Sequence, residues 1–345
     1  MNSKGRDKEI AEIVETLRAC QVARVMLGYP NPISPVFPEM LKDWSRIKIQ
    51  AERSRVREDL RIELKKFQQQ NFPNLKKQQL AQLYLHFYKN KHYQAPLVEF
   101  EKFVGGSKAK VFAGVPRHAT VHISIPWGLQ TQFPEHLLMK DIAIIYNNLR
   151  SNHKQLSNFK TRKQSELITD DTRLEINKLA IATYSRMCLI SCFNLLEAYI
   201  NGIAWDYNYS YGTSMLTSKQ IKMITESSES LVNRIIEIPH IIAKQKFPKK
   251  NISIFKEDDP LIKDFIELIK PYRDSIVHAS PFSVPEKFGG YSKLDKIYNL
   301  EVATVDKAIN IIRDIISRIH VSLEGKGKLP EWYYKMSSDG EFILE

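Results

Sequence analysis

Four side chains suited to acid–base and anion chemistry stand close together in the stretch RDSIVH: Arg273, Asp274, Ser275 and His278. Histidine titrates near neutrality, so His278 can donate or accept a proton. The guanidinium of Arg273 stays charged, and its planar fork matches two oxygens of a phosphate. A simpler interpretation is that an arginine and a histidine on the last turn of a helix complement its dipole.

A helix is predicted to position these residues. Asp258 or Asp259 can cap it, with Pro260 at its first position. Pro271 is expected to bend the helix, and Pro281 to end it. Apolar residues recur at the spacing of a buried stripe, at Leu261, Phe265, Leu268, Ile269, Tyr272 and Ile276. The polar cluster therefore belongs to the last turns of this helix.

The spacing of the cluster matters for its chemistry. Asp274 and His278 are four residues apart and share a face, so the carboxylate can orient the imidazole. Arg273 and His278 are five apart and diverge by about 140° around the helix. Two copies facing each other across a two-fold axis can bring each arginine toward the partner's histidine. We therefore expect a homodimer.

Residues 273–278 resemble the signature of HEPN domains, in which an arginine, commonly followed by a polar residue, precedes a histidine by four to six positions. The order of elements is also similar, because the motif ends a bundle helix and a loop and a last long helix at 301–323 follow. Upstream, SCFNLLEAYIN at 191–201 is similar to the early HEPN helix with an acidic residue, here Glu197. The resemblance covers roughly 141–324, and the long stretch between the early helix and the motif helix departs from it.

The resemblance implies a metal-independent endoribonuclease without a cofactor, in which the 2′-hydroxyl of the RNA is the nucleophile. His278 would be the general acid or base, Arg273 would hold the phosphate, and Asp274 would orient the imidazole. Ser275 would add a hydrogen bond, and Glu197 would support the motif. Many HEPN proteins are toxins or abortive-infection effectors in phage defence, so an antitoxin or a phage-derived trigger is an expected partner beside RNA.

Two other classes of function remain open on the sequence. One is an inactive HEPN-like module for dimerisation or for binding a nucleotide or nucleic acid. The other is an unrelated two-domain regulator that binds nucleic acid through residues 41–80. An intact Arg273 and His278 favour the enzyme over the first, and no clear helix-turn-helix pattern supports the second.

The pattern of apolar residues along the chain predicts a mainly α protein with two domains. Residues 1–140 mix helical segments with an alternating stretch at 108–128, which indicates a smaller α+β domain. Its role is not indicated by these residues, and sensing or recognition is the expectation that accompanies the resemblance. Residues 141–345 have helical periodicity, which indicates a helical bundle, and the resemblance implies that the bundle is HEPN-like. We expect its core to contain Leu195, Leu196, Tyr199, Ile235, Ile242, Phe265, Leu268 and Ile312.

Composition indicates a cytoplasmic protein that acts on a polyanion. The 345 residues include 51 Lys and Arg against 39 Asp and Glu, a net charge of +12. The three cysteines form no CxxC pair, and the N-terminal segment has no apolar signal core. The apolar segment 179–205 is interrupted by Arg186, Asn194 and Glu197, so we expect a bundle helix and no membrane association.

The basic excess has a visible concentration at residues 41–80, with eleven Lys and Arg against five acidic residues. Arg53, Arg57, Arg61 and Lys65 are the candidates there for contact with a phosphate backbone. The alternative is an exposed helix whose charges pair with one another.

His118 and His122 on a strand have no third ligand at useful spacing, and Cys188 and Cys192 have no nearby histidine, so no metal site is predicted.

Overall fold

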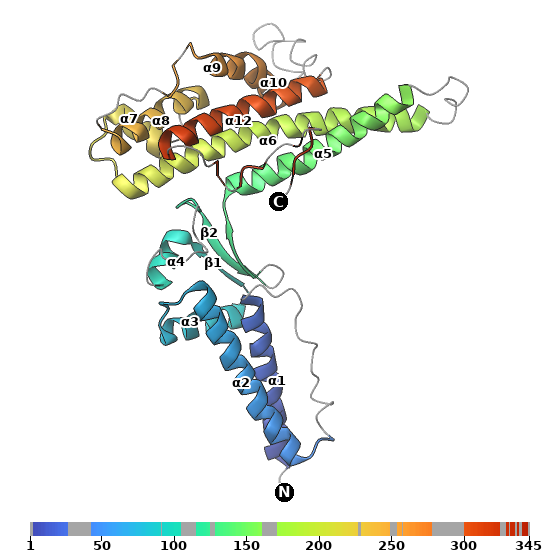
Figure 1. Ribbon diagram of the computed structural model, residues 1–345, viewed down its shortest axis with the longest axis vertical. Helices are drawn as coiled ribbons and strands as arrows, with labels where there is room; N and C mark the ends of the chain where they lie inside the picture. Colours follow the sequence, from blue (N-terminus) through green and yellow to red (C-terminus); the bar gives the residue numbers. More distant parts are fainter. Residues whose placement is uncertain are drawn as a thin grey trace. The chain divides into compact units, whose positions relative to one another are not determined.

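The computed structural model divides the chain into two compact units, Met1–Phe133 and Pro134–Glu345 (Figure 1). It describes residues 3–26, 43–90, 92–104, 115–124, 128–160, 171–226, 229–248, 254–256, 258–277, 300–324, 329–330, 332–334, 337 and 340–343. Helices make up most of these residues, which confirms a mainly α protein. The division falls at Phe133 and not at residue 140, because the first helix of the second unit already begins at Pro134.

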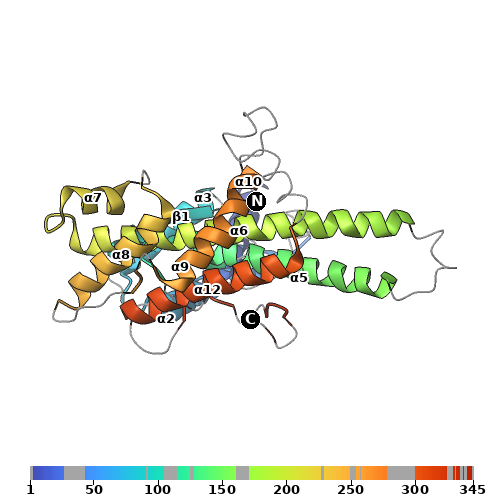
Figure 2. The ribbon, with the colours of Figure 1, turned by 90° about the horizontal axis from the view of Figure 1, so that it is seen from above.

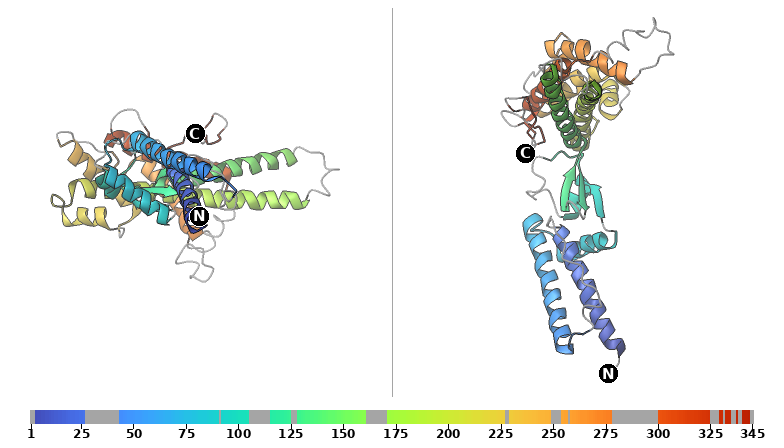
Figure 3. Two further views of the ribbon diagram at one scale, coloured as in Figure 1. Left: turned by 90° about the horizontal axis from the view of Figure 1, so that it is seen from below. Right: turned by 90° about the vertical axis from the view of Figure 1, so that its right-hand side faces the viewer.

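In the first unit, helices α1 (Ser3–Met26) and α2 (Arg46–Asn71) lie side by side and run in the same direction (Figure 3). Apolar side chains of both helices form a small core of Ile10, Ile13, Val14 and Ile49. The thiol of Cys20 donates to the carbonyl oxygen of Val56 over 3.3 Å. Ser45 caps α2, since its hydroxyl oxygen accepts from the backbone nitrogen of Lys48.

The rest of this unit is a small sheet with two short helices. Helix α3 (Lys77–Asn90) precedes β1 (His92–Pro96), and α4 (Leu97–Val104) separates β1 from β2 (Thr120–Ser124) and β3 (Gly128–Gln132). The sheet has the order β1-β2-β3, with both pairs antiparallel. Ala119 and Val121 are buried, which is the two-residue alternation of a half-buried strand. The described part of Met1–Phe133 is thus α+β.

The second unit is built on a long hairpin of α5 (Pro134–Lys160) and α6 (Asp171–Tyr211), one end of which extends beyond the other helices (Figure 2). Helices α7 (Ser218–Thr225) and α8 (Leu231–Lys246) follow. Next come α9 (Pro260–Asp264), the π-helical turn η4 (Phe265–Ile269) and α10 (Lys270–Val277), and then α12 (Val302–Glu324), which packs on α6, α8 and η4. Residues 141–324 contain no strand in their described part, as the periodicity predicted.

The core of the bundle agrees with the sequence prediction at all but one position. Leu268 is only half-buried. It lies in the wide turn η4, which rotates its side chain away from the stripe that a regular helix would bury. The other seven predicted core residues are buried: Leu195, Leu196, Tyr199, Ile235, Ile242, Phe265 and Ile312.

A segment after α12, which the sequence analysis did not assign to the core, also packs on the bundle. The rings of Tyr199 and Trp332 lie 6.1 Å apart, and those of Tyr146 and Phe342 lie 5.4 Å apart. The side chain of Asn147 makes two hydrogen bonds with the backbone of Phe342, donating to its oxygen over 3.1 Å and accepting from its nitrogen over 3.0 Å. This segment closes one side of the α5 and α12 pair.

Helix α6 is the one helix, among the described residues, that is long and apolar enough to cross a membrane. Its apolar window is 39% buried within the structure, and the helix contacts α5, α12, α8 and α10. The central helix of a helical bundle passes the same test of length and composition.

Candidate functional site at the end of the motif helix

The motif helix begins where the sequence predicted. Asp259 is the N-cap, and its carboxylate oxygen accepts from the backbone nitrogen of Leu261 over 3.0 Å, with Pro260 at the first helical position. The same carboxylate pairs with Arg318 of α12 at 2.8 Å. The cap therefore also fixes the motif helix against the last long helix.

The irregularity in this helix is the turn η4, which lies just before Pro271. In a straight α-helix Phe265 and Arg273, eight positions apart, would point about 80° apart. The wider turn η4 uses fewer degrees per residue, so it brings the two side chains closer to one face. Both of them contact Phe193 of α6, as the ring and cation distances show.

Arg273 lies on an aromatic support. Its guanidinium carbon is 4.6 Å from the centroid of the Phe193 ring, which is a cation–π distance. Phe193 in turn stacks with Phe265 at 5.9 Å. The side chain of Arg273 is 28% exposed, so its charge is held at the edge of the bundle with access to solvent.

Asp274 is engaged by two cations. Its carboxylate accepts from Lys270 and from Arg273, each over 3.0 Å. Burial tends to raise the pKa of Asp274, but these two hydrogen bonds outweigh it and hold the pKa below its ordinary value. The carboxylate was expected to orient His278. That histidine lies outside the described residues, so the structure tests neither this contact nor the predicted place of His278.

Ser275 is 1% exposed, and its hydroxyl donates to the carbonyl oxygen of Pro271 over 2.7 Å. A hydroxyl that bonds in this way to the carbonyl four residues earlier is satisfied within its own helix and tends to bend that helix. Its proton is therefore directed into its own helix, and not toward a substrate.

Glu197 is one turn after Phe193 on α6, and its charge acts on Arg234 of α8. Arg234 is only 4% exposed, and its Nε has no hydrogen-bond partner. Burial lowers the pKa of Arg234, and the nearby Glu197 carboxylate opposes that shift. Neither a hydrogen bond nor an ion pair joins Glu197 to Arg273 in the described part of the bundle, so support of the motif by Glu197 is indirect, through α6.

Sequence reasoning missed Phe193 and Arg234. A signal for Phe193 was its place four residues before Glu197, on the same helix face. Arg234 stands in the first turn of α8, where the helix dipole disfavours a cation, and such a position points to a specific partner.

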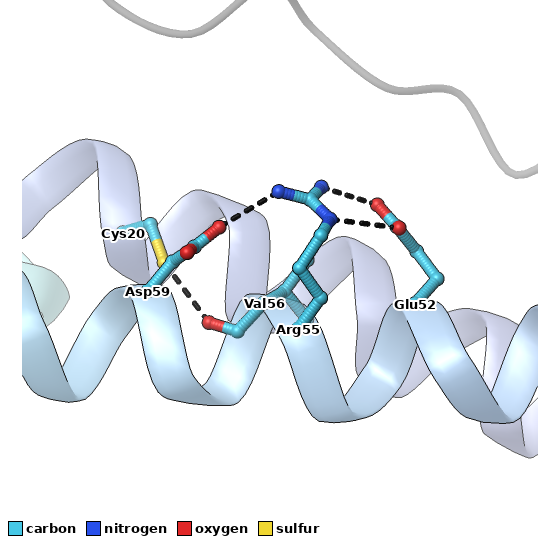
Figure 4. A network of polar contacts seen from close by, with 5 residues as sticks. All are labelled: Cys20, Glu52, Arg55, Val56 and Asp59. Atoms are coloured by element: carbon cyan, nitrogen blue, oxygen red, sulfur yellow. Dashed lines mark hydrogen bonds and ion pairs between the residues drawn. The ribbon is translucent and has the colours of Figure 1, made fainter.

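The basic helix α2 carries mostly neutralised arginines. Arg53 and Arg57 both pair with Glu12 of α1, and Arg61 pairs with Glu58. Figure 4 shows Arg55 between Glu52 and Asp59, at 2.5 and 2.8 Å. The hydrogen bonds from Arg55 lower the pKa of Glu52.

Lys65, the fourth candidate for phosphate contact, is exposed and has no ion pair in the described part of the chain.

The remaining sequence candidates are structural in their described parts. Cys188 and Cys192 are buried side by side in α6. His122 lies 3.1 Å from the side-chain nitrogen of Gln132 on the neighbouring strand. The described residues contain no group of three His, Cys, Asp or Glu side chains that could hold a metal ion.

At α10 the guanidinium of Arg273 is held in one orientation by the ring of Phe193 and by Asp274, with Lys270 on the other side of that carboxylate. In comparisons with known proteins, no family model matches the chain, and no curated protein or solved structure matches it either.

Proposed function

We propose that the second unit is a HEPN-type bundle that cleaves RNA without a metal ion, as a toxin or abortive-infection effector in the cytoplasm. The observation that supports this most is the placement of Arg273. It stands at the end of a bundle helix, on Phe193 and beside Asp274, five residues before His278. A guanidinium held in one orientation suits a phosphate that must be aligned with the attacking oxygen for the reaction to occur.

In the proposed reaction a basic imidazole, His278, takes the proton of an RNA 2′-hydroxyl. The 2′-oxygen then attacks the adjacent phosphorus, the bond to the 5′-oxygen breaks, and that oxygen is protonated as it leaves. Arg273 balances the charge that develops on the phosphate oxygens. The products are a 2′,3′-cyclic phosphate and a free 5′-hydroxyl.

A second copy of the chain is part of the proposal because residues five positions apart, such as Arg273 and His278, would diverge by about 140° on a regular helix. Two exposed apolar side chains, one on the motif helix and one on α6, are available for such a contact. Val277 of α10 is 48% exposed, and Met187 of α6, the helix that carries Phe193, is 46% exposed. We expect Met187→Glu with Val277→Glu to convert a homodimer into a monomer in light scattering. Met215→Glu, at an 85% exposed methionine after α6, is the matched control. A wild-type monomer at tens of micromolar would contradict the composite site.

The test of the activity is cleavage of single-stranded RNA in EDTA by wild type beside two variants. His278→Ala should lose at least about 100-fold, the effect of a general acid or base. Arg273→Lys should also be poor, since a point charge cannot replace the bidentate fork. DNA of the same sequence should resist, because it lacks the 2′-hydroxyl. Equal cleavage by wild type and His278→Ala would show that the activity lies elsewhere.

The second candidate is an inactive HEPN-like module for dimerisation or nucleotide binding. One observation favours it: Arg273 is partly buried and already paired with Asp274, as structural arginines often are. Expression of the intact chain decides between the two in cells. If wild type is toxic and His278→Ala relieves the toxicity, the nuclease proposal is supported. If neither protein cuts RNA with or without a trigger, the inactive-module proposal is supported instead.

A further inference from the structure

The positive charge of the chain is concentrated in the first unit. Residues 1–133 hold 22 of the 51 Lys and Arg and 12 of the 39 Asp and Glu, a net charge of +10. The remaining 29 basic and 27 acidic residues leave residues 134–345 with only +2. The unit with the proposed catalytic residues therefore has little long-range attraction for a polyanion, whereas the first unit has much.

Within the first unit the excess comes from a stretch without acids. From Leu64 to Val98 the chain has six lysines and no aspartate or glutamate. Further toward the N-terminus the acidic residues Glu12, Glu52, Glu58 and Asp59 pair with four of the five arginines of α2, Arg53, Arg55, Arg57 and Arg61. The largest group of cations without nearby acids in the sequence thus belongs to the end of α2 and to α3.

The structure holds Lys65, Lys66, Lys76 and Lys77 near a fixed corner between α2 and α3, and Lys89 lies in the last turn of α3. The side-chain nitrogen of Gln68 donates to the carbonyl oxygen of Leu75 over 2.5 Å, which ties the end of α2 to the start of α3. Phe67, Phe72 and Leu75 are buried beneath the corner. Because the backbone is anchored in this way, little conformational entropy is lost when a ligand binds to the corner.

Five exposed lysines form what we call the lysine surface: Lys65, Lys66, Lys76, Lys77 and Lys89. In the described part of the chain only Lys66 has an ion pair, a long one of 3.5 Å to Glu63. The exposed positions between them on α3 include Gln78 and Gln82, which can donate hydrogen bonds to phosphate or sugar oxygens. Leu85 is the exposed large apolar residue of α3 in the described positions.

We propose that the lysine surface binds the phosphate backbone of single-stranded RNA and brings it to the protein. That the polyanion is RNA rests on the proposed function; that a polyanion binds here rests on charge and ion pairing alone. We expect binding to be independent of the RNA sequence, because the lysines would contact phosphates and not base edges. It also replaces Arg53, Arg57 and Arg61 as the phosphate contacts, since those arginines are neutralised by acids.

The test uses a fluorescent single-stranded RNA with 2′-O-methyl groups, which cannot undergo attack by its own 2′-oxygen. Binding is measured by anisotropy across a salt series. One variant replaces the five lysines of the lysine surface with glutamine. The matched control replaces five exposed lysines of the second unit: Lys154, Lys219, Lys222, Lys244 and Lys263. Both variants lower the net charge from +12 to +7.

Each lost contact should reduce the slope of log affinity against log salt by about 0.7 for a single strand, or about 5-fold in affinity near 0.1 M salt. We expect the lysine-surface variant to bind at least about 25-fold more weakly, the loss of two such contacts. The control should change by less than about 3-fold, and Lys65→Gln with Lys66→Gln alone should have an intermediate effect.

The proposal is overturned if both five-lysine variants lose affinity equally, or if neither does. It is also overturned if wild type floats with phosphatidylserine vesicles and ignores the RNA, since the surface would then be a membrane contact. Failure of the nuclease proposal looks different. In that case the modified RNA binds as expected, but unmodified RNA survives with wild type as well as with His278→Ala.

Discussion

The two units use their charges in opposite ways. In Met1–Phe133 most cations are at the surface, where acids neutralise the arginines of α2 and leave the lysines of the α2–α3 corner available. In Pro134–Glu345 the two arginines described above are fixed by their surroundings: Arg273 lies on Phe193 at the edge of the bundle, and Arg234 is buried near Glu197. A surface charge of the first kind attracts ligands from a distance, whereas a fixed charge of the second kind orients what has arrived. The difference teaches that net charge and the placement of chemistry are separate properties of this chain.

The largest expected effect comes from the two cores, and it separates the units. Phe67→Ala and Phe265→Ala each remove a fully buried ring, and each should lower the free energy of unfolding by about 3 to 5 kcal/mol. Phe67→Ala should weaken RNA binding and leave cleavage of saturating RNA intact. Phe265→Ala should do the reverse, because it removes the support under Phe193. Denaturant unfolding together with both assays measures this.

Ile266→Ala is the control for the second core, since Ile266 is in the same turn η4 and is exposed. It should change the free energy of unfolding by less than about 1 kcal/mol. If Phe67→Ala and Phe265→Ala impaired binding and cleavage alike, the division of labour between the units would be wrong.

A medium effect distinguishes buried charge from exposed charge. Glu197→Gln removes the carboxylate that opposes the burial of the Arg234 charge, and we expect it to cost about 2 kcal/mol of stability. Glu52→Gln breaks an exposed pair with Arg55 in the first unit and should cost about 0.5 kcal/mol. Thermal unfolding of the two variants in parallel provides the comparison. Equal losses would show that Arg234 does not depend on Glu197.

The smallest effect is a dependence on pH that both units share. The folded-state pKa values of Asp274 and Glu52 lie below their ordinary values of 3.8 and 4.5. Each carboxylate therefore contributes stability that is complete above its ordinary pKa and is lost as the pH falls through the lowered one. Unfolding between pH 7 and about pH 2 should show this decline, and Asp274→Asn or Glu52→Gln should reduce its slope. A decline unchanged in both variants would assign it to other groups.

Local signals in the sequence predicted a good part of the fold. The cap at Asp259 and the proline after it were predicted because each depends on neighbours within one turn. Of the apolar stripe that follows, only Phe265 and Ile269 are buried, because the turn η4 interrupts the regular period. The alternation around Val121 gave β2 for the same reason. Most of the predicted bundle core was also confirmed, since a helical stripe reports which face is buried.

Contacts between distant segments were not predictable in this way. The pairing of Arg53 and Arg57 with Glu12 joins residues more than 40 positions apart, so the sequence suggested available cations where the fold neutralises them. The turn η4 rotates the residues after it, and no periodicity of apolar residues announces such a change. The pairing of Arg273 with Asp274 was not predicted, although the two residues adjoin in the sequence. The ring of Phe193 beneath Arg273 depends on how α6 crosses the motif helix.

The hydrogen bonds between Asn147 and Phe342 join positions 195 residues apart. During synthesis α5 is made long before this segment. The side chains of α5 that contact the segment therefore stay uncovered until nearly 200 further residues have been added. Closing such a distant contact is slow compared with forming a hairpin. Tyr146 and Tyr199, which Phe342 and Trp332 contact, are therefore aromatic side chains that the nascent bundle leaves accessible to chaperones and to other unfinished chains until this segment has been made.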